Sequence, residues 1–121
     1  MKYEIAADEE HHLICTKVRG ELTVESISGL TKDVGAAAAK HGIAQLLFDM
    51  RDTTEAADTM DAFLLAAHPE NRGLDHSHKR AIVYNGRNEL YQFFETVSNN
   101  RGYLVKTFTD MDLAQAWLAE A

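Results

Sequence analysis

Segments with the two-residue period of strands alternate with segments of helical period along this chain, and that alternation restricts its fold more than any other feature. Only a short acidic connection separates the first two expected strands, which predicts an antiparallel hairpin. Each later strand follows a helix, which predicts right-handed crossovers and parallel pairing. The sequence therefore predicts an α/β fold of order ββαβαβαβα, whose mostly parallel five-stranded sheet has its first strand as an antiparallel edge. The expected strands are residues 3–7, 12–19, 45–49, 81–84 and 103–108.

Polar residues and glycines mark the expected ends of these elements. Gly20 is expected to end the second strand, and Gly42 to end a helix over residues 24–41. A second helix is expected to stop at Pro69, and a third carries Leu90, Phe94 and Val97 at helical spacing. The expected N-caps are Thr23, Asp58 and, in a capping box with Asp112, Thr109.

Apolar positions predict which faces are buried. In the second helix they form the stripe Met60, Phe63, Leu64 and Ala67, and in the last helix we expect Leu113 and Trp117 to contact the core. The strands at 45–49 and 81–84 are apolar almost throughout, which is typical of strands covered on both faces. If the helices lie on one face of the sheet, the other face needs a cover, so we expect a homodimer.

Length and charge exclude several classes of protein. The 121 residues are one ordinary domain, residues 1–121. With 12 Lys and Arg against 19 Asp and Glu, the net charge of −7 argues against a nucleic-acid partner. Cys15 is the single cysteine, which excludes an internal disulfide and a cysteine-based zinc site. The sequence shows neither a signal-peptide pattern nor an apolar run long enough for a membrane span, so we expect a cytoplasmic protein without membrane insertion.

Four segments resemble the SpoIIAA-like (STAS-like) family of small bacterial proteins. They are residues 18–23, 47–52, 79–84 and 105–110, the last followed by 114–118. The resemblance covers nearly the whole chain. It implies a β-α superhelical sheet with helices largely on one side, the fold shared by anti-sigma-factor antagonists and Sec14-type lipid-binding domains.

The resemblance also implies a phosphorylation site, and here the chain departs from the family. Antagonists carry an Asp-Ser-Ser-Gly-like motif at the helix start after the third strand. The corresponding segment is Ala57-Asp58-Thr59-Met60-Asp61, in which no glycine follows. Thr59 is the candidate phosphoacceptor, although two carboxylates would repel a phosphate there.

No catalytic signature is present, so we expect neither an enzyme nor a cofactor. Phosphate-binding and dinucleotide-binding loops and a Gly-x-Ser-x-Gly elbow are absent, and Cys15 lies within a strand. His76 and His78 are weak candidates for metal ligands, with Asp75 or His68 completing the set. The alternative is a solvated loop followed by surface residues at Lys79 and Arg80.

The carboxyl edge of the sheet is the first candidate binding site, because ligands favour that edge in parallel sheets. Three loops are expected to converge there, at residues 49–54, 85–88 and 107–110. Its polar groups would hold a small anion or a phosphorylated partner, or would only cap turns and helices. These candidates are Asp49, Arg51, Thr53, Thr54, Asn85, Arg87 and Thr109.

A second candidate is the apolar patch of Tyr91, Phe93 and Phe94, because one helix face cannot bury all three rings. The surplus ring would cover a neighbouring helix, line an apolar pocket or form a dimer seam.

The function predicted first is therefore a non-enzymatic STAS-like regulatory or binding module that acts by protein–protein contact or small-ligand binding. One alternative is a carrier of lipids or other apolar ligands with a Sec14-like fold. Another is an anti-sigma-factor antagonist phosphorylated at Thr59. Basic residues gather between Arg72 and Arg87, the exception in an acidic chain.

Overall fold

The computed structural model describes residues 1–55, 58–86 and 89–120, without the side chains of Glu55 and Thr59. The element order is the predicted ββαβαβαβα. The strands are β1 (Lys2–Asp8), β2 (Leu13–Leu22), β3 (Gln45–Glu55), β4 (Lys79–Val83) and β5 (Leu104–Phe108). The α-helices are α1 (Val24–His41), α2 (Thr59–Ala67), α3 (Glu89–Asn100) and α4 (Met111–Ala119), and a 3-10 turn, Pro69–Arg72, follows α2.

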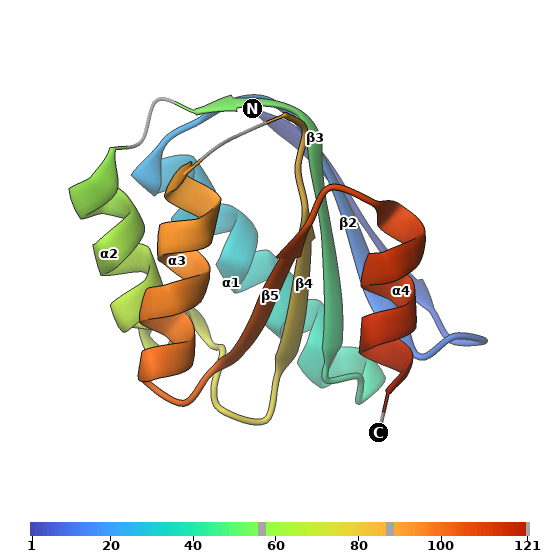
Figure 1. Ribbon diagram of the computed structural model, residues 1–121. Helices are drawn as coiled ribbons and strands as arrows, with labels where there is room; N and C mark the ends of the chain where they lie inside the picture. Colours follow the sequence, from blue (N-terminus) through green and yellow to red (C-terminus); the bar gives the residue numbers. More distant parts are fainter. Residues whose placement is uncertain (56–57, 87–88, 121) are drawn as a thin grey trace.

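The strands form one sheet in the order β1-β2-β3-β4-β5 (Figure 1). β1 and β2 are antiparallel, and every later pair is parallel. This confirms the predicted fold class and edge strand. Because β2 to β5 run in the same direction, their carboxyl ends meet at one edge of the sheet.

Helices cover both faces of the sheet (Figure 1). Side-chain alternation along β3 places Phe48 and Met50 in the core beneath α1, α2 and α3, whereas Leu47 belongs to the core beneath α4. Ala114 and Leu118 of α4 pack into that second core. The described helices therefore lie largely on one side, as the resemblance implies, and α4 covers the other face, for which a second copy was expected as the cover.

The two longest strands extend beyond their predicted ends. β2 continues through Gly20, whose φ of +100° suits glycine, to Leu22, which pairs with Glu55 of β3. Their register shifts between Lys17 and Arg19, as at a β-bulge. Gly20 therefore does not end the strand.

The expected caps of α1 are confirmed. The Thr23 side chain accepts a hydrogen bond from the Ser26 amide, and the Ser26 hydroxyl accepts one from the Thr23 amide. Gly42 follows the helix in the left-handed conformation, with φ +64°.

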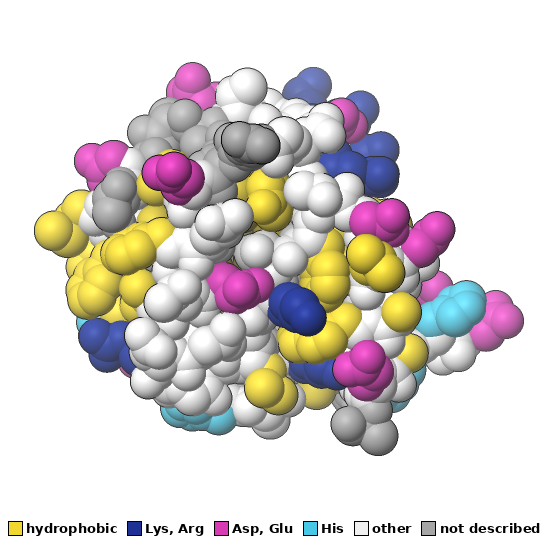
Figure 2. Space-filling model, viewed as in Figure 1, with side chains coloured by type: hydrophobic (Ala, Val, Ile, Leu, Met, Phe, Trp, Pro, Cys, Tyr) yellow, Lys and Arg dark blue, Asp and Glu magenta, His cyan; other side chains and the backbone are white. Residues whose placement is uncertain are grey.

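The buried side of α2 differs from the predicted stripe. Asp58 caps the helix as expected. Of the predicted stripe, Ala67 is buried and Phe63 is half-buried, whereas Met60 and Leu64 are 64% and 47% exposed. The other buried residues are Ala62, Leu65 and Ala66. The helix therefore turns the side with Ala62, Leu65 and Ala66 inward and leaves Met60 and Leu64 outward. Figure 2 shows the apolar surface gathered over α2, at the left of the view.

The last helix begins one residue later than predicted. Its N-cap is Asp110, whose side chain accepts a hydrogen bond from the Leu113 amide, so the expected Thr109–Asp112 capping box is wrong. Leu113 is 61% exposed, whereas Trp117 is half-buried beside Phe108. Within the part of the chain that is described, no helix has the length and apolar character needed to cross a membrane.

Candidate functional site

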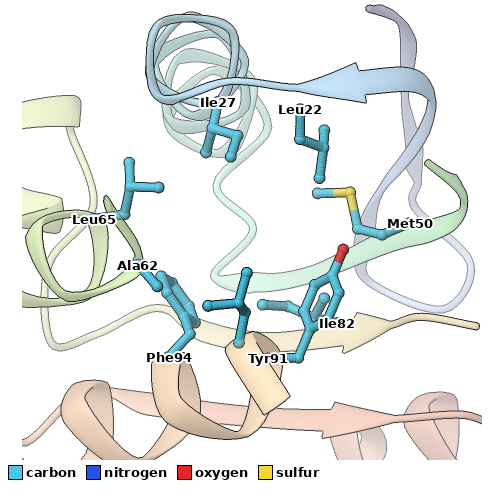
Figure 3. A pocket seen from close by; sticks show the side chains of 9 residues that line it. Leu22, Ile27, Met50, Ala62, Leu65, Ile82, Tyr91 and Phe94 are labelled. Atoms are coloured by element: carbon cyan, nitrogen blue, oxygen red, sulfur yellow. The ribbon is translucent and has the colours of Figure 1, made fainter. Parts of the chain in front are cut away.

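An apolar pocket of about 90 Å³ opens between α2, α3 and the sheet (Figure 3). Its floor comes from residues of three parallel strands, and its walls from three helices. All of its accessible lining is apolar. The lining residues are Leu22, Ile27, Met50, Ala62, Leu65, Ile82, Leu90, Tyr91 and Phe94.

The three aromatic residues predicted as one patch on α3 do not all face the pocket. Tyr91 and Phe94 line the pocket, whereas the half-buried Phe93 does not. The Tyr91 ring stacks on the buried Tyr84 at 4.6 Å between centroids, with an interplanar angle of 13°. This stacking holds one wall of the pocket in place.

The segment Asp49–Thr54 was predicted as a loop, but it belongs to β3. Residues 52–55 pair with 19–22 of β2, so their backbone groups are bonded within the sheet. The Thr53 hydroxyl donates to the Met50 carbonyl at 2.6 Å, and Thr54 is exposed. This part of the expected binding loop is therefore a strand.

Asp49 and Arg51 form an ion pair on the α4 side of the sheet, away from the apolar pocket. Arg51 Nε and Nη2 each donate to a different carboxylate oxygen of Asp49 at 2.9 Å. These bonds lower the pKa of Asp49 and raise that of Arg51. Asp49 lines a shallow hollow beside α4 together with Lys17 and Gln115. Strand alternation thus separates this pair from Met50 and the pocket.

The remaining edge residues lie at the ends of β4 and β5. The Asn85 Nδ2 group donates to the Arg51 carbonyl at 3.4 Å, so these two predicted residues are adjacent. Thr109 is exposed just after β5, whose Phe108 carbonyl accepts a hydrogen bond from the Tyr84 amide at 2.9 Å. Arg87 lies outside the described residues.

Thr59 is the first residue of α2, and its side chain is not among those described. Asp58 and Asp61 form a capping box at the start of this helix. The Asp58 carboxylate accepts from the Asp61 amide at 2.9 Å, and the Asp61 carboxylate accepts from the Asp58 amide at 3.1 Å. Two carboxylates therefore already occupy the helix start at which a phosphate on Thr59 would be placed.

The two candidate metal ligands are engaged separately. The His76 ring stacks on Tyr103 at 4.1 Å between centroids, and its Nε2 lies 3.1 Å from the Arg101 carbonyl. His78 Nδ1 instead accepts from the Asp75 amide at 3.0 Å. Among the residues described, no three His, Cys, Asp or Glu side chains are grouped to hold a metal ion.

Cys15 lies on the α4 side of β2 and is half-buried. Burial raises the pKa of its thiol, and the negative charge of Asp8 raises it further. The thiol is therefore protonated at neutral pH, which fits the expected unreactive cysteine.

Sequence reasoning missed most of the pocket and one charged residue below it. Arg80 was expected at the surface, but it is only 5% exposed, since β4 begins at Lys79 and turns Arg80 toward the core beneath α3. The spacing of the two residues could have predicted this burial, because Arg80 lies two positions before Ile82 and alternate residues of a strand share one face.

Comparison with known proteins agrees with this fold. The SpoIIAA-like family model matches residues 13–119. No curated protein matches the chain.

Solved structures show the same architecture. An anti-sigma factor antagonist from Mycobacterium paratuberculosis superposes with a TM-score of 0.62 and 15% identity, over 98% of this chain and 96% of that one. An uncharacterised protein with a SpoIIAA-like fold from Shewanella loihica gives 0.56 and 22%, over 97% and 92%. The anti-sigma factor antagonist SpoIIAA in its unphosphorylated form gives 0.54 and 10%, over 96% and 97%. With the family match spanning most of its length, the chain belongs to the SpoIIAA-like family.

Proposed function

We propose that this protein is a non-enzymatic binding module that holds the apolar part of a small molecule in the pocket between α2, α3 and the sheet. The observation that supports this is the wholly apolar lining, contributed by six separate elements. Apolar pockets at the carboxyl ends of parallel strands are common ligand sites. Apart from the Tyr91 hydroxyl, the lining offers no acid, base or nucleophile, which favours binding over catalysis.

The size of the pocket limits the ligand. A cavity of about 150 Å³ holds benzene, so a pocket of about 90 Å³ receives a short chain end or a branched group rather than a whole lipid. Burying about four methylene groups yields about 3 kcal/mol, which corresponds to a dissociation constant weaker than about 1 mM. Tighter binding therefore requires a polar contact beyond the lining.

Methyl-resolved NMR tests this proposal. Titration of the full chain with 1-hexanol should shift the methyl signals of Ile27, Leu65 and Ile82 together, with millimolar affinity. Ala62→Leu fills the pocket and should abolish the shifts, whereas Ala36→Leu, at an exposed position of α1, should leave them intact. Unchanged hexanol binding in Ala62→Leu would place the site elsewhere and refute the proposal.

A second candidate is a regulatory protein that acts through a protein partner or a second copy of itself. It is supported by the outward-facing Met60 and Leu64, one helical turn apart, and by the fold it shares with two anti-sigma factor antagonists. Light scattering tests the homodimer, and a mass of 13.5 kDa at micromolar concentration would exclude it.

Phosphorylation of Thr59 is tested by incubation with cellular kinase fractions and phosphopeptide mapping. The absence of phosphate on Thr59 would exclude the switch.

A further inference from the structure

A buried charge lies directly below the apolar pocket. Arg80 precedes the pocket residue Ile82 by two positions on the same face of β4, and it is 5% exposed. Its guanidinium makes no hydrogen bond or ion pair with any residue that the structure describes. Its neighbours are instead two rings, Phe94 at 5.7 Å and Tyr103 at 6.0 Å from the ring centroids.

A second arginine adds to this charge. Arg72 donates from Nη2 to the carbonyl of Leu65, a pocket residue, and its buried Nε has no partner among the described residues. Its positive charge, after burial itself, contributes to lowering the pKa of Arg80 to about 10. Since this value is well above 7, the Arg80 guanidinium remains charged at neutral pH, and Arg72 is charged too because arginine keeps its proton in proteins.

The carboxylate of Glu70 does not neutralise the two arginines. Glu70 attracts Arg72 electrostatically, but it accepts a hydrogen bond from the Tyr103 hydroxyl at 2.6 Å and lies 3.5 Å from His68 Nδ1. It lies within ion-pair distance of neither Arg72 nor Arg80, as far as the described residues go. The region below the pocket therefore carries a net positive charge with free donors.

Phe94 separates this charge from the pocket. The same ring lines the pocket and lies against the Arg80 guanidinium. A pocket ligand that contacts Arg80 therefore has to displace this ring. A buried cation without an anion is costly, and a ligand carboxylate would supply the planar, bidentate partner that a guanidinium prefers.

We propose that the pocket binds a short-chain monocarboxylate, with its chain against the apolar lining and its carboxylate turned inward to Arg80. This inference rests on the proposed function and names its ligand class. A carboxylate fits better than a phosphate, because the small pocket favours a compact group with a single charge. Arg80 thereby supplies the polar contact that the apolar lining lacks.

Paired probes test the inference. Hexanoate and 1-hexanol share a chain and differ in the charged group, and both are titrated into the full chain by methyl NMR. We expect hexanoate to bind at least tenfold more tightly than hexanol. Arg80→Gln should abolish this preference while hexanol still binds. Arg101→Gln removes an exposed charge and should preserve it.

The outcomes separate the two proposals. Hexanol binding with an equal or weaker response to hexanoate overturns the carboxylate inference and leaves the apolar site standing. A carboxylate preference that persists in Arg80→Gln also overturns it. No response to hexanol in the wild type refutes the proposed function itself. If Arg80→Gln does not fold, the Arg80 Nε–H signal of the wild type decides: a shift with hexanoate but not with hexanol supports the inference, and no shift overturns it.

Discussion

Replacing Arg80 with methionine should stabilise the unliganded protein, although the side chain removed is buried in the core. Burial, with a contribution from Arg72, lowers the pKa of Arg80 to about 10, well below its ordinary value. A folded-state pKa below the unfolded value means that folding disfavours the charged form. The penalty is present in full below about pH 10 and is relieved only as the pH rises from there toward the ordinary pKa of arginine. At pH 7 the protein therefore carries the whole cost.

The size of the effect follows from this shift and from what Arg80 contacts. At about 1.36 kcal/mol per pKa unit, the lowering of the Arg80 pKa to about 10 corresponds to a cost of about 3 kcal/mol. The contacts with Phe94 and Tyr103 return about 1 to 2 kcal/mol in total. Methionine is unbranched and of similar length, so it keeps most of the packing. We expect Arg80→Met to raise the free energy of unfolding by about 1 to 2 kcal/mol.

Urea unfolding at pH 7 measures this change. The midpoint should rise with an unchanged m value, and the melting temperature should rise by about 3 to 8 °C. Arg101→Met, at an exposed position, should change stability by less than about 0.5 kcal/mol. If Arg80→Met lowers the free energy of unfolding by about 1 kcal/mol or more, the ring contacts outweigh the cost of desolvation. Arg80 would then be a stabilising core residue and not an uncompensated charge, and this reasoning would be wrong.

Three further predictions concern other parts of the molecule. Gly42→Ala should lower the free energy of unfolding by about 1 kcal/mol in urea titrations, because Gly42 has φ +64°. The hydrogen bond to Asp8 at 2.8 Å raises the pKa of His11. An NMR titration should therefore show His11 titrating above its ordinary value, and Asp8→Asn should remove the difference; the associated stabilisation is complete below the ordinary pKa and is lost as the pH rises through the raised one. Since burial raises the pKa of Cys15, iodoacetamide should alkylate it more slowly in the native protein than in urea at pH 8.

The sequence predicted elements well where backbone periodicity was decisive and poorly where polar residues lay within strands. Asp49, Arg51 and Asp52 suggested a loop because strands are poor in such residues. However, Asp52 pairs with Arg19 of β2, and the two strands run side by side to Leu22 and Glu55. A strand persists wherever a neighbour satisfies its backbone groups, and that neighbour is not visible in the local pattern.

The orientations of α4 and α2 were not predicted, for a related reason. Thr109 and Asp110 are both suitable N-caps, and choosing between them rotates the expected helix by about 100°. The cap at Asp110 turns Ala114 and Leu118 toward the sheet and leaves Leu113 in solvent. The orientation of α2 also differs from the prediction: Ala62, Leu65 and Ala66 are buried, and Met60 and Leu64 are exposed. Tertiary contacts decided both cases, and the sequence pattern alone did not distinguish the alternatives.

Most of the pocket beyond Tyr91 and Phe94 escaped prediction, because the face of the sheet on which a strand residue lies, rather than its type, decides whether it borders the pocket. Along β3, Met50 belongs to the pocket, and its neighbour Asp49 belongs to the opposite face of the sheet. The charged pair expected to bind a ligand is thus separated from the apolar cavity by the thickness of the sheet. In β4, Arg80 and Ile82 lie on the same face, because alternate residues of a strand share a face. This was not expected, because the strand was predicted to begin at residue 81 and it begins at Lys79. A two-residue error in one strand boundary therefore concealed the charge that lies beneath the pocket.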